Sequence, residues 1–600
     1  MIKQHLPNWD LHSIYPSFES NQYKQDKCLL TDHIKNFEKL LTETATISSE
    51  WLLKLIHVFE AASNTAENLS SYCNAIYTVN TRDNVALAQI NEVDMLELPL
   101  KKLIVIFRAF LAKHKEDILR LIHNDEALVR YEFFIQESID KASYQMNEEM
   151  EDLANDLARS GADAWARLHN GMSSTANIIW DDNTGERKTV IALRDLAHSE
   201  DRIVRKRAYT AELAAWKSVE IPIAAALNGI KGYAISLDKR RGWQSVFQKS
   251  SSQSRISEKT LFTLIHTLEK SLPVFRTYLN AKAKFLGIKK CAFYDLFAPV
   301  QTGNKSFKRW NWQDATSFIT ARFSDFDPLM AEFARKVFDS SWIDAEGHEG
   351  KIGGAYCVDF PLAGESRILC NFEGSFDSVT TVAHETGHAW HSAVTRDLPR
   401  FQSLYPMTLA ETASIFAETI VFEGALEQSD DEERITLIEG SIKDACQVIV
   451  DILSRFYFEK ELFERRKTAE LTPEELCEIM LNAQKKTYGD GLDEKELHPY
   501  MWAVKTHYYN YALPFYNYPY AFGQLFALSL YSRAKAEGPS FAKAYRDLLQ
   551  NTGRMSAENV AVQAGFDIRH EDFWQQGVAV ITERIGRFVK AAGLIPDENK

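Results

Sequence analysis

Three histidines and a glutamate stand close together in the stretch "SVTTVAHETGHAWHSAV", residues 378–394. Among them, His384, Glu385 and His388 match the pattern H-E-x-x-H. On an α-helix, residues four apart lie on one face, so both imidazoles can bind one metal ion. Glu385 would lie beside that ion, where it can deprotonate a metal-bound water molecule. The spacing therefore predicts a hydrolytic zinc site.

The alternative is a helix whose histidines are only hydrogen-bonded in the core. Small and apolar residues surround the motif, as in a buried helix, and buried histidines without a metal would need several polar partners. The third histidine, His391, stands where metzincins have a glycine, and Val394 stands where they have their third histidine. The metzincin class is therefore excluded. We interpret His391 as a packing residue or as a residue behind the ligands.

The third protein ligand is expected elsewhere in the chain, as in other sites with two histidines and a glutamate. The best candidate segment is "MTLAETASIFAETIVFEGAL", residues 407–426, which is apolar at helical spacing. It carries Glu411 and Glu418 on nearly one helical face. However, Thr408 and Glu411 also match a capping box, and Glu418 also fits an ion-paired surface residue. The spacing alone leaves the choice open.

A third cluster is aromatic. The segment "HYYNYALPFYNYPYAFG", residues 507–523, holds six tyrosines between positions 508 and 520, directly after His507. Hydrolysis of an amide builds an oxyanion, and histidine or tyrosine can donate hydrogen bonds to it. The alternative is an aromatic core or a stacking surface. We expect at least one of these tyrosines to belong to the site.

Most of the chain is predicted to be helical, because apolar residues recur at intervals of three and four. Residues 48–62 and 256–287 show this pattern clearly, and the second segment has Ser257 as a predicted N-cap and Gly287 as a predicted end. The helices must position the histidines and glutamates just described.

One segment breaks the helical pattern. Residues 353–374 contain two extended stretches around a Pro/Gly turn region, which predicts a β-hairpin directly before the H-E-x-x-H motif. Its edge could hold a peptide by strand addition, or the hairpin could be purely structural. A further loop or hairpin is predicted at residues 181–190.

Composition excludes several classes of protein. The 600 residues carry a formal net charge of −14, which disfavours binding to nucleic acid or anionic lipid. No apolar run is long enough to span a bilayer, and the N-terminus lacks the apolar region of a signal peptide. The seven cysteines are scattered and lack C-x-x-C spacing. These features predict a reduced, soluble, cytoplasmic protein without nucleic-acid or membrane partners. They do not indicate an oligomeric state.

Six segments together resemble the M3 family of zinc metallopeptidases. The resemblance is closer to the oligoendopeptidase F branch and more distant to thimet oligopeptidase. The segments span most of the chain in the family's order: "RGWQS" (241–245), "YDLFAPV" (294–300), "GGAYC" (353–357), "NFEGSFDSVTTVAHETGHAWHS" (371–392), "AETASIFAE" (410–418) and "HYYNYALPFYNYPYAFG" (507–523).

The resemblance implies a mainly α-helical, elongated, two-lobed fold with a deep central channel and a small β-hairpin or sheet beside the active site. It implies an N-terminal helical domain in residues 1–200 and a peptidase catalytic domain in residues 201–600. It also implies one zinc ion per chain as cofactor and oligopeptides as substrates.

The resemblance assigns roles to individual residues. It implies that His384, His388 and Glu411 bind the zinc ion and that Glu385 is the general base. Glu418 would orient a ligand histidine. It further implies two groups around the substrate: His507, Tyr511 and Tyr518 at the transition state, and Gly354, Ala355, Tyr356 and Tyr516 along the bound peptide.

The predicted function is zinc-dependent hydrolysis of internal bonds in short, unfolded peptides. One alternative is a dipeptidyl carboxypeptidase or carboxypeptidase with the same chemistry. It would need a clamp for the terminal carboxylate, and no motif in the sequence identifies one. Another alternative is a peptide-binding protein with a vestigial zinc site, against which the intact Glu385 argues.

Overall fold

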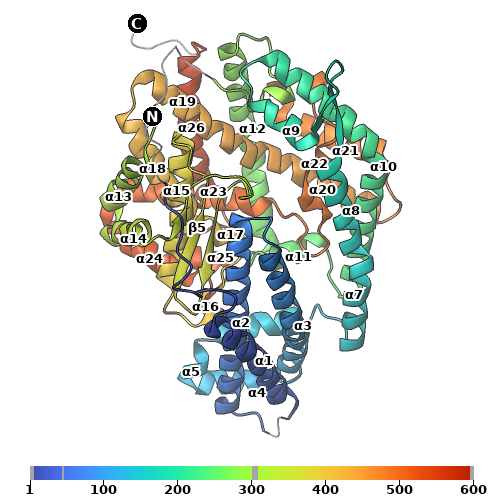
Figure 1. Ribbon diagram of the computed structural model, residues 1–600, viewed down its shortest axis with the longest axis vertical. Helices are drawn as coiled ribbons and strands as arrows, with labels where there is room; N and C mark the ends of the chain where they lie inside the picture. Colours follow the sequence, from blue (N-terminus) through green and yellow to red (C-terminus); the bar gives the residue numbers. More distant parts are fainter. Residues whose placement is uncertain (1–5, 44–45, 301–307, 595–600) are drawn as a thin grey trace. The chain divides into compact units, whose positions relative to one another are not determined.

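The fold is described from a computed structural model of the chain (Figure 1). The structure describes residues 6–43, 46–300 and 308–594, and most of them lie in α-helices. The predicted mainly helical class is therefore confirmed. The chain forms two compact units, each built from three stretches. Unit 1 comprises Met1–Glu148, Ser306–Glu427 and Leu530–Asp567, and unit 2 comprises Glu149–Lys305, Gln428–Ser529 and Ile568–Lys600.

The predicted domains 1–200 and 201–600 do not coincide with these two units, and both ranges include residues outside those described. The domain boundary at residue 200 stays a prediction.

Unit 1 contains the helices α1 (Asn21–Thr42), α2 (Ser49–Val79), α3 (Asn84–Lys113), α4 (Lys115–Asn124), α5 (Glu126–Val129), α6 (Glu132–Ala142), α13 (Trp312–Phe326), α14 (Pro328–Asp339), α15 (Phe376–Thr395), α16 (Arg400–Ser403), α17 (Met407–Ala410), α18 (Thr412–Gln428), α24 (Ala542–Asn551) and α25 (Ala557–Gln563). Helix α23 (Tyr518–Glu537) begins in unit 2 and ends in unit 1.

The helices between residues 21 and 142 bury their apolar stripes in one core. Phe59 of α2 lies at its centre, with ring centroids 4.8 Å from Phe37, 5.4 Å from Phe107 and 4.6 Å from Phe401 of α16. Phe401 comes from the segment between α15 and α17, so this core also anchors the chain that leads to Glu411.

A three-stranded sheet of unit 1 packs on α2 and α15. Its strands are β3 (Ile343–Asp344), β4 (Tyr356–Phe360) and β5 (Glu365–Leu369), in the order β3-β5-β4. Strands β4 and β5 are antiparallel and form the hairpin predicted in residues 353–374. Gly364 turns between them with a φ of +62°, which glycine adopts without strain. The hairpin therefore leaves β4 at the edge of the sheet.

Unit 2 contains the helices α7 (Glu148–Ser160), α8 (Ala162–Thr175), α9 (Val190–Asp195), α10 (Arg202–Arg240), α11 (Val246–Gln253), α12 (Glu258–Phe285), α19 (Asp431–Cys446), α20 (Ile452–Arg466), α21 (Pro473–Tyr488), α22 (Met501–Val504) and α26 (Glu571–Ala591). A two-stranded hairpin of β1 (Asn177–Asp181) and β2 (Glu186–Thr189) confirms the turn predicted at residues 181–190.

The ends of α12 follow the predicted signals. The side chain of Ser257 accepts a hydrogen bond from the backbone N–H of Thr260, as an N-cap does. Gly287 follows the helix with a φ of +66°. Within the described residues, no helix combines the length and apolar composition that crossing a membrane requires. All seven cysteines are free thiols.

Candidate metal centre and active site

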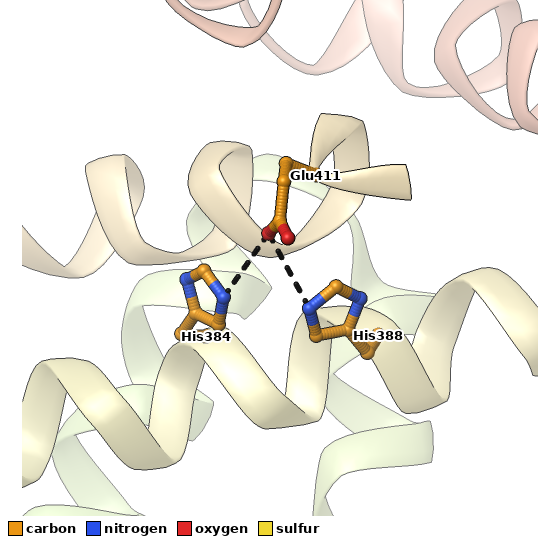
Figure 2. Close-up of side chains that lie close together, drawn as sticks. All are labelled: His384, His388 and Glu411. Carbon is orange, nitrogen blue, oxygen red and sulfur yellow. Dashed lines mark ion pairs between the residues drawn. The ribbon is translucent and has the colours of Figure 1, made fainter. Parts of the chain in front are cut away.

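Helix α15 carries the H-E-x-x-H motif, as predicted. Its N-cap, Ser375, accepts a hydrogen bond from the backbone N–H of Ser378. Residues such as Val382 and Ala389 bury the apolar face of the helix. His384 and His388 lie one turn apart on one face, with ring centroids 5.0 Å apart (Figure 2).

Gly387 allows the neighbouring helix α18 to approach the backbone of α15 closely. A Cβ atom at this position would lie 2.7 Å from the carbonyl oxygen of Ala413 and 2.9 Å from the Cβ atom of Ala417. Real Cβ atoms do not approach other atoms so closely, so only glycine fits. Helix α18 therefore packs directly on the backbone of α15, between the two histidines.

Glu411 lies at a break between two helices. Helix α17 ends at Ala410 and α18 begins at Thr412, so residues 407–426 are not one continuous helix. The N-cap of α17 is Pro406, and Thr408 lies inside that helix, so the alternative of a capping box at Thr408 and Glu411 is not realised. The Glu411 carboxylate points instead between the two imidazoles (Figure 2).

The three side chains form a donor set that fits a metal ion. Oε2 of Glu411 lies 3.3 Å from Nε2 of His384 and 3.5 Å from Nε2 of His388. All three donor atoms lie within 4.8 Å of one another. Ligands at about 2.1 Å from a tetrahedral zinc ion stand about 3.4 Å apart. The two short separations therefore match two edges of such a tetrahedron.

Glu418 contacts the other side of the first histidine. Its Oε2 atom lies 3.1 Å from Nδ1 of His384. Burial by itself lowers the pKa of His384, but the hydrogen bonds to Glu411 and Glu418 outweigh it and raise the pKa to about 10. For Glu411, burial raises the pKa, but the two histidines hold it well below its usual range. The carboxylates thus stabilise the protonated form of His384, and the histidines stabilise the ionised form of Glu411.

Glu385 differs from these glutamates. Its side chain is only 6 % exposed, and its carboxylate has no hydrogen bond or ion pair within the described part of the chain. Burial raises its pKa, while His384 and His388 oppose that effect. The structure thus places beside the donor set a carboxylate that is free to accept a proton.

His391 faces the core instead of the donor set. It is fully buried, its ring stacks on Tyr405 with centroids 4.1 Å apart, and its Nε2 atom lies 2.8 Å from Oγ1 of Thr552. Burial lowers its pKa to about 3. The interpretation of His391 as a packing residue agrees with these contacts.

The residues predicted to lie along a peptide stand at the start of β4. Gly354 has a φ of +84°, and its carbonyl oxygen accepts a hydrogen bond from Nδ2 of Asn371 at 3.0 Å. Ala355 follows, and Tyr356 turns its side chain toward α2, where its hydroxyl lies 2.6 Å from Oγ1 of Thr78. The Tyr356 side chain is therefore held by unit 1 itself.

The outer edge of β4 is open in the described residues. The backbone N–H groups of Ile368 and Cys370 donate to backbone carbonyls at β3. The alternate residues of β5, Leu369 and Arg367, therefore direct their backbone groups toward β4, opposite Tyr356 and Val358. Backbone groups alternate along a strand. The N–H and C=O groups of Ala355, Cys357 and Asp359 therefore point to the open edge.

His507 lies in unit 2, in the 3₁₀-helix η6 (Thr506–Tyr509). Its ring stacks on Tyr516 with centroids 4.7 Å apart, and its Nδ1 atom lies 3.2 Å from Nδ2 of Asn517. Burial, with the nearby Arg455 and Lys505, lowers the pKa of His507 to about 4. The imidazole is therefore neutral at pH 7.

Helix α11 forms hydrogen bonds to the backbone of the loop at residues 510–517, which contains Tyr511 and Tyr516. Side chains of this helix donate hydrogen bonds to three loop carbonyls: Lys249 Nζ to Tyr511 O (3.3 Å), Gln253 Nε2 to Ala512 O (2.9 Å) and Ser250 Oγ to Pro514 O (3.0 Å). Phe515 has a φ of +54°, a strained value for a non-glycine residue, and its ring is buried.

The predicted tyrosines divide into two groups. Tyr511 and Tyr516 line a cavity of about 410 Å³ together with His507. Tyr518 does not line it: its side chain is 1 % exposed and its hydroxyl donates to Oγ of Ser254 at 2.8 Å. The structure therefore brings Tyr511 and Tyr516, but not Tyr518, to the histidine's cavity.

Sequence reasoning missed two polar features, one in each unit. Asn517 contacts His507, and only its position inside the aromatic cluster could have drawn attention to it. In unit 1, a cavity of about 260 Å³ lies at the end of β4 and is lined by Asp359, Arg396 and Arg400. Arg400 forms an ion pair with Glu67, whereas Arg396 has no partner among the described residues.

Comparison with known proteins decides the family. The sequence profile described as peptidase family M3 matches residues 195–580, which is more than half of the chain. The chain belongs to peptidase family M3. A second profile, described as oligopeptidase F, matches residues 110–175. As a member of this family, the chain is a metallopeptidase, and the resemblance inferred from the sequence is confirmed.

Two M3 relatives show the extent of the similarity. An oligoendopeptidase F homolog of Lactococcus lactis is 24% identical over 592 residues, covering 97% of this chain and 96% of the relative. The group B oligopeptidase PepB of Streptococcus agalactiae is 28% identical over 395 residues, covering 65% of this chain and 64% of the relative.

A solved structure shows the same fold. The oligoendopeptidase F of Enterococcus faecium matches with a TM-score of 0.71 at 19% sequence identity, covering 95% of this chain and 98% of that chain. This likeness supports the M3 fold of the chain.

Proposed function

We propose that this M3 peptidase is a zinc-dependent endopeptidase that hydrolyses internal bonds of short, unfolded peptides. One observation carries the proposal: three donor atoms lie within 4.8 Å of one another, two of their separations match tetrahedral edges, and the adjacent Glu385 carboxylate has no partner among the described residues. Relatives named oligoendopeptidases support the endopeptidase assignment. Zinc as the metal and oligopeptides as the substrates belong to this proposal.

His384 and His388, through Nε2, and Glu411, through Oε2, would hold the zinc ion. Bound there, zinc would polarise the scissile carbonyl and lower the pKa of a water molecule. Glu418 accepts the Nδ1–H of His384, which fixes the tautomer that leaves Nε2 free for the metal.

Glu385 would act as the general base. Its carboxylate takes a proton from the attacking water and passes it to the leaving amine. Burial raises its pKa, and a carboxylate with a raised pKa is a better proton acceptor near neutral pH. The absence of a competing partner among the described residues leaves its oxygens available for this transfer.

His507 would donate a hydrogen bond to the oxyanion. Because its pKa is lowered to about 4, the ring is neutral and carries one N–H at neutral pH. Tyr511 and Tyr516 are the tyrosines that line its cavity, and we propose that one of them donates beside it. Tyr518, whose hydroxyl is already engaged, would support the loop.

The open edge of β4 would hold the peptide. The backbone groups of Ala355, Cys357 and Asp359 can pair with an extended chain by strand addition. Main-chain pairing tolerates many side chains and needs an extended substrate, which suits short, unfolded peptides.

One observation favours the alternative of a dipeptidyl carboxypeptidase. Arg396 lines the cavity at the end of β4 and has no partner among the described residues, so it could hold a terminal carboxylate. In that case Arg396→Ala would lower kcat/KM only for peptides with a free C-terminus. Arg335→Ala, which removes an exposed arginine of α14, is the matched control.

Peptides of graded length with acetylated N-termini and amidated C-termini test the proposal. An endopeptidase cuts them internally, a chelator abolishes the cuts, and metal analysis finds about one zinc ion per chain. Cuts only in peptides with a free C-terminus would support the carboxypeptidase. No turnover by the metal-loaded protein would contradict both enzymes and support a peptide-binding protein.

A further inference from the structure

The cavity of about 410 Å³ in unit 2 has a second wall that the proposed mechanism does not use. One wall is the segment 506–516 with His507 and the tyrosines. The other wall is the first half of α8, with Asp163 in its first turn. Asp163 is thus the acidic residue of an otherwise neutral lining.

The aromatic rings around the cavity are held in place by their neighbours. Tyr509 stacks on His169 with centroids 3.5 Å apart, and Tyr511 meets Tyr233 edge to face at 5.1 Å. Tyr516 stacks on His507, as described above. The rings therefore form a prearranged surface whose faces attract cations.

The carboxylate of Asp163 is not neutralised. It has no hydrogen bond or ion pair within the described residues. Three nearby cations are paired: Arg241 with Glu151 at 2.6 Å, Lys249 with Asp238 at 2.7 Å, and Arg455 with Asp451. A fourth cation, Lys505, lies near His507, and burial lowers its pKa to about 7. Burial chiefly raises the pKa of Tyr511, the charge of Asp163 adds to that effect, and the charge of Arg241 opposes it. Among the residues that line the cavity, Asp163 is therefore the one with a charged side chain at neutral pH.

A structural role alone explains Asp163 only in part. A carboxylate in the first turn of a helix stabilises the helix dipole, and any exposed acid in that turn would do so. Asp163 instead lines a cavity walled by three tyrosines. A half-buried negative charge beside aromatic faces is the arrangement that binds a lysine or arginine head group.

We propose that this cavity binds a positively charged group of the peptide, with Asp163 pairing the charge and the tyrosine rings packing around it. The inference rests on the proposed peptidase function and names its substrate preference. The net charge of −14 would attract cationic peptides to the protein as a whole. The cation is either a lysine or arginine side chain or the α-amino end of the peptide.

Matched peptides distinguish these two sources. In end-blocked peptides, lysine is exchanged for norleucine, one position at a time, and kcat/KM is compared within each pair. In a second set, a free N-terminus is compared with an acetylated one. The wild-type enzyme should favour the charged member about tenfold or more at one position or at the N-terminus, as expected for a charge-assisted hydrogen bond.

Substitutions at Asp163 test its part in this preference. Asp163→Asn should bring the ratio within about twofold of unity, and Asp163→Lys should favour glutamate over norleucine at the same place, because the charge is removed or reversed. Asp182→Asn removes an exposed charge from the β1–β2 turn and should leave the ratio as in the wild type. Equal ratios in the wild type and Asp163→Asn at every position and at the N-terminus would overturn the inference.

Failure of the proposed function gives a different result. If the metal-loaded enzyme cleaves none of the peptides, the peptidase proposal fails. Calorimetric binding of the same lysine and norleucine peptides to the wild type and to Asp163→Asn then decides whether the cavity takes a cation. Tighter binding of the lysine peptide, lost in Asp163→Asn, supports the inference, and equal binding refutes it.

Discussion

Oε2 of Glu418 lies 3.1 Å from Nδ1 of His384. The opposite nitrogen of the same ring faces Glu411 at 3.3 Å, so the imidazole is held between two carboxylates of one segment. Each carboxylate contacts one ring nitrogen, which fixes the orientation of the ring. The ligand set is therefore preorganised by the protein fold.

Replacing Glu418 tests this orienting role. Glu418→Gln should weaken metal affinity about tenfold to a hundredfold, because the ring of His384 loses its charged acceptor. Glu411→Ala should weaken it further, because a ligand is lost. Competition with a chromophoric chelator measures both. Glu427→Gln, an exposed glutamate of α18, is the control, and wild-type affinity in Glu418→Gln would contradict the role.

Replacing Glu385 separates metal binding from turnover. Glu385→Gln should keep the bound metal, because Glu385 is not in the donor set. Its kcat should fall about 10²- to 10⁴-fold, because the amide cannot accept the proton. Metal content and kcat are measured on the same preparation. Full turnover would rule out Glu385 as the general base.

Gly387→Ala should disturb the metal centre without touching a ligand. The added methyl group would collide with the backbone of α18 at Ala413, and overpacking of this kind costs about 1–3 kcal/mol. We expect lower stability in urea and weaker metal binding. Gly440→Ala in α19 is the control, because nothing lies within 4 Å of its Cβ position. Equal behaviour of the two variants would contradict the close-contact argument.

His391 should make the protein sensitive to acid. Its pKa is about 3 in the fold and about 6.5 in an unfolded chain, so the unfolded state binds a proton first as pH falls. Stability from this group is complete above pH 6.5 and is lost as pH falls from there toward 3. Between pH 7.5 and 5 the loss amounts to about 2 kcal/mol.

His391→Phe keeps a ring against Tyr405 and removes the proton-binding group. Urea unfolding at pH 7.5 and at pH 5 should therefore show a smaller loss of stability in this variant than in the wild type. An identical loss in both proteins would show that other groups govern acid unfolding.

The tyrosines of the 507–523 segment should separate by the property that they affect. Tyr516→Phe should lower kcat by about 10²-fold if its hydroxyl donates to the oxyanion, with little change in stability. Tyr518→Phe should lower stability by about 0.5–1.5 kcal/mol, because it removes a buried hydrogen bond, and should change kcat little. The opposite pattern would indicate that Tyr518, and not Tyr516, contacts the transition state.

Local sequence patterns were enough to predict the two histidines of the site and the hairpin before them. The spacing of His384 and His388 follows from the helical repeat alone, and the hairpin before them follows from strand and turn residues. The break at Glu411 was not predictable, because residues 407–426 have continuous helical periodicity. That break coincides with the contact of α18 on Gly387, a tertiary interaction that no window of the sequence contains.

Asp163 and Arg396 illustrate the same limit. Each stands in or beside a helix whose local pattern gives its charge an ordinary surface explanation. Only the fold brings Asp163 to the tyrosines and Arg396 to the end of β4. Residues that act through distant neighbours leave no periodic signal. The family resemblance supplied part of that information for His507, but none for these two.

Glu411 lies on a different segment from both histidines, so a bound metal ion would also stabilise the fold. An ion held by all three side chains would tie α15 to the α17–α18 junction. Ligands that bind only the folded state stabilise it, by about 4 kcal/mol when the free ion exceeds its dissociation constant a thousandfold. The melting temperature should therefore fall when the metal is stripped. Thermal denaturation can then report metal occupancy even in variants that cleave nothing.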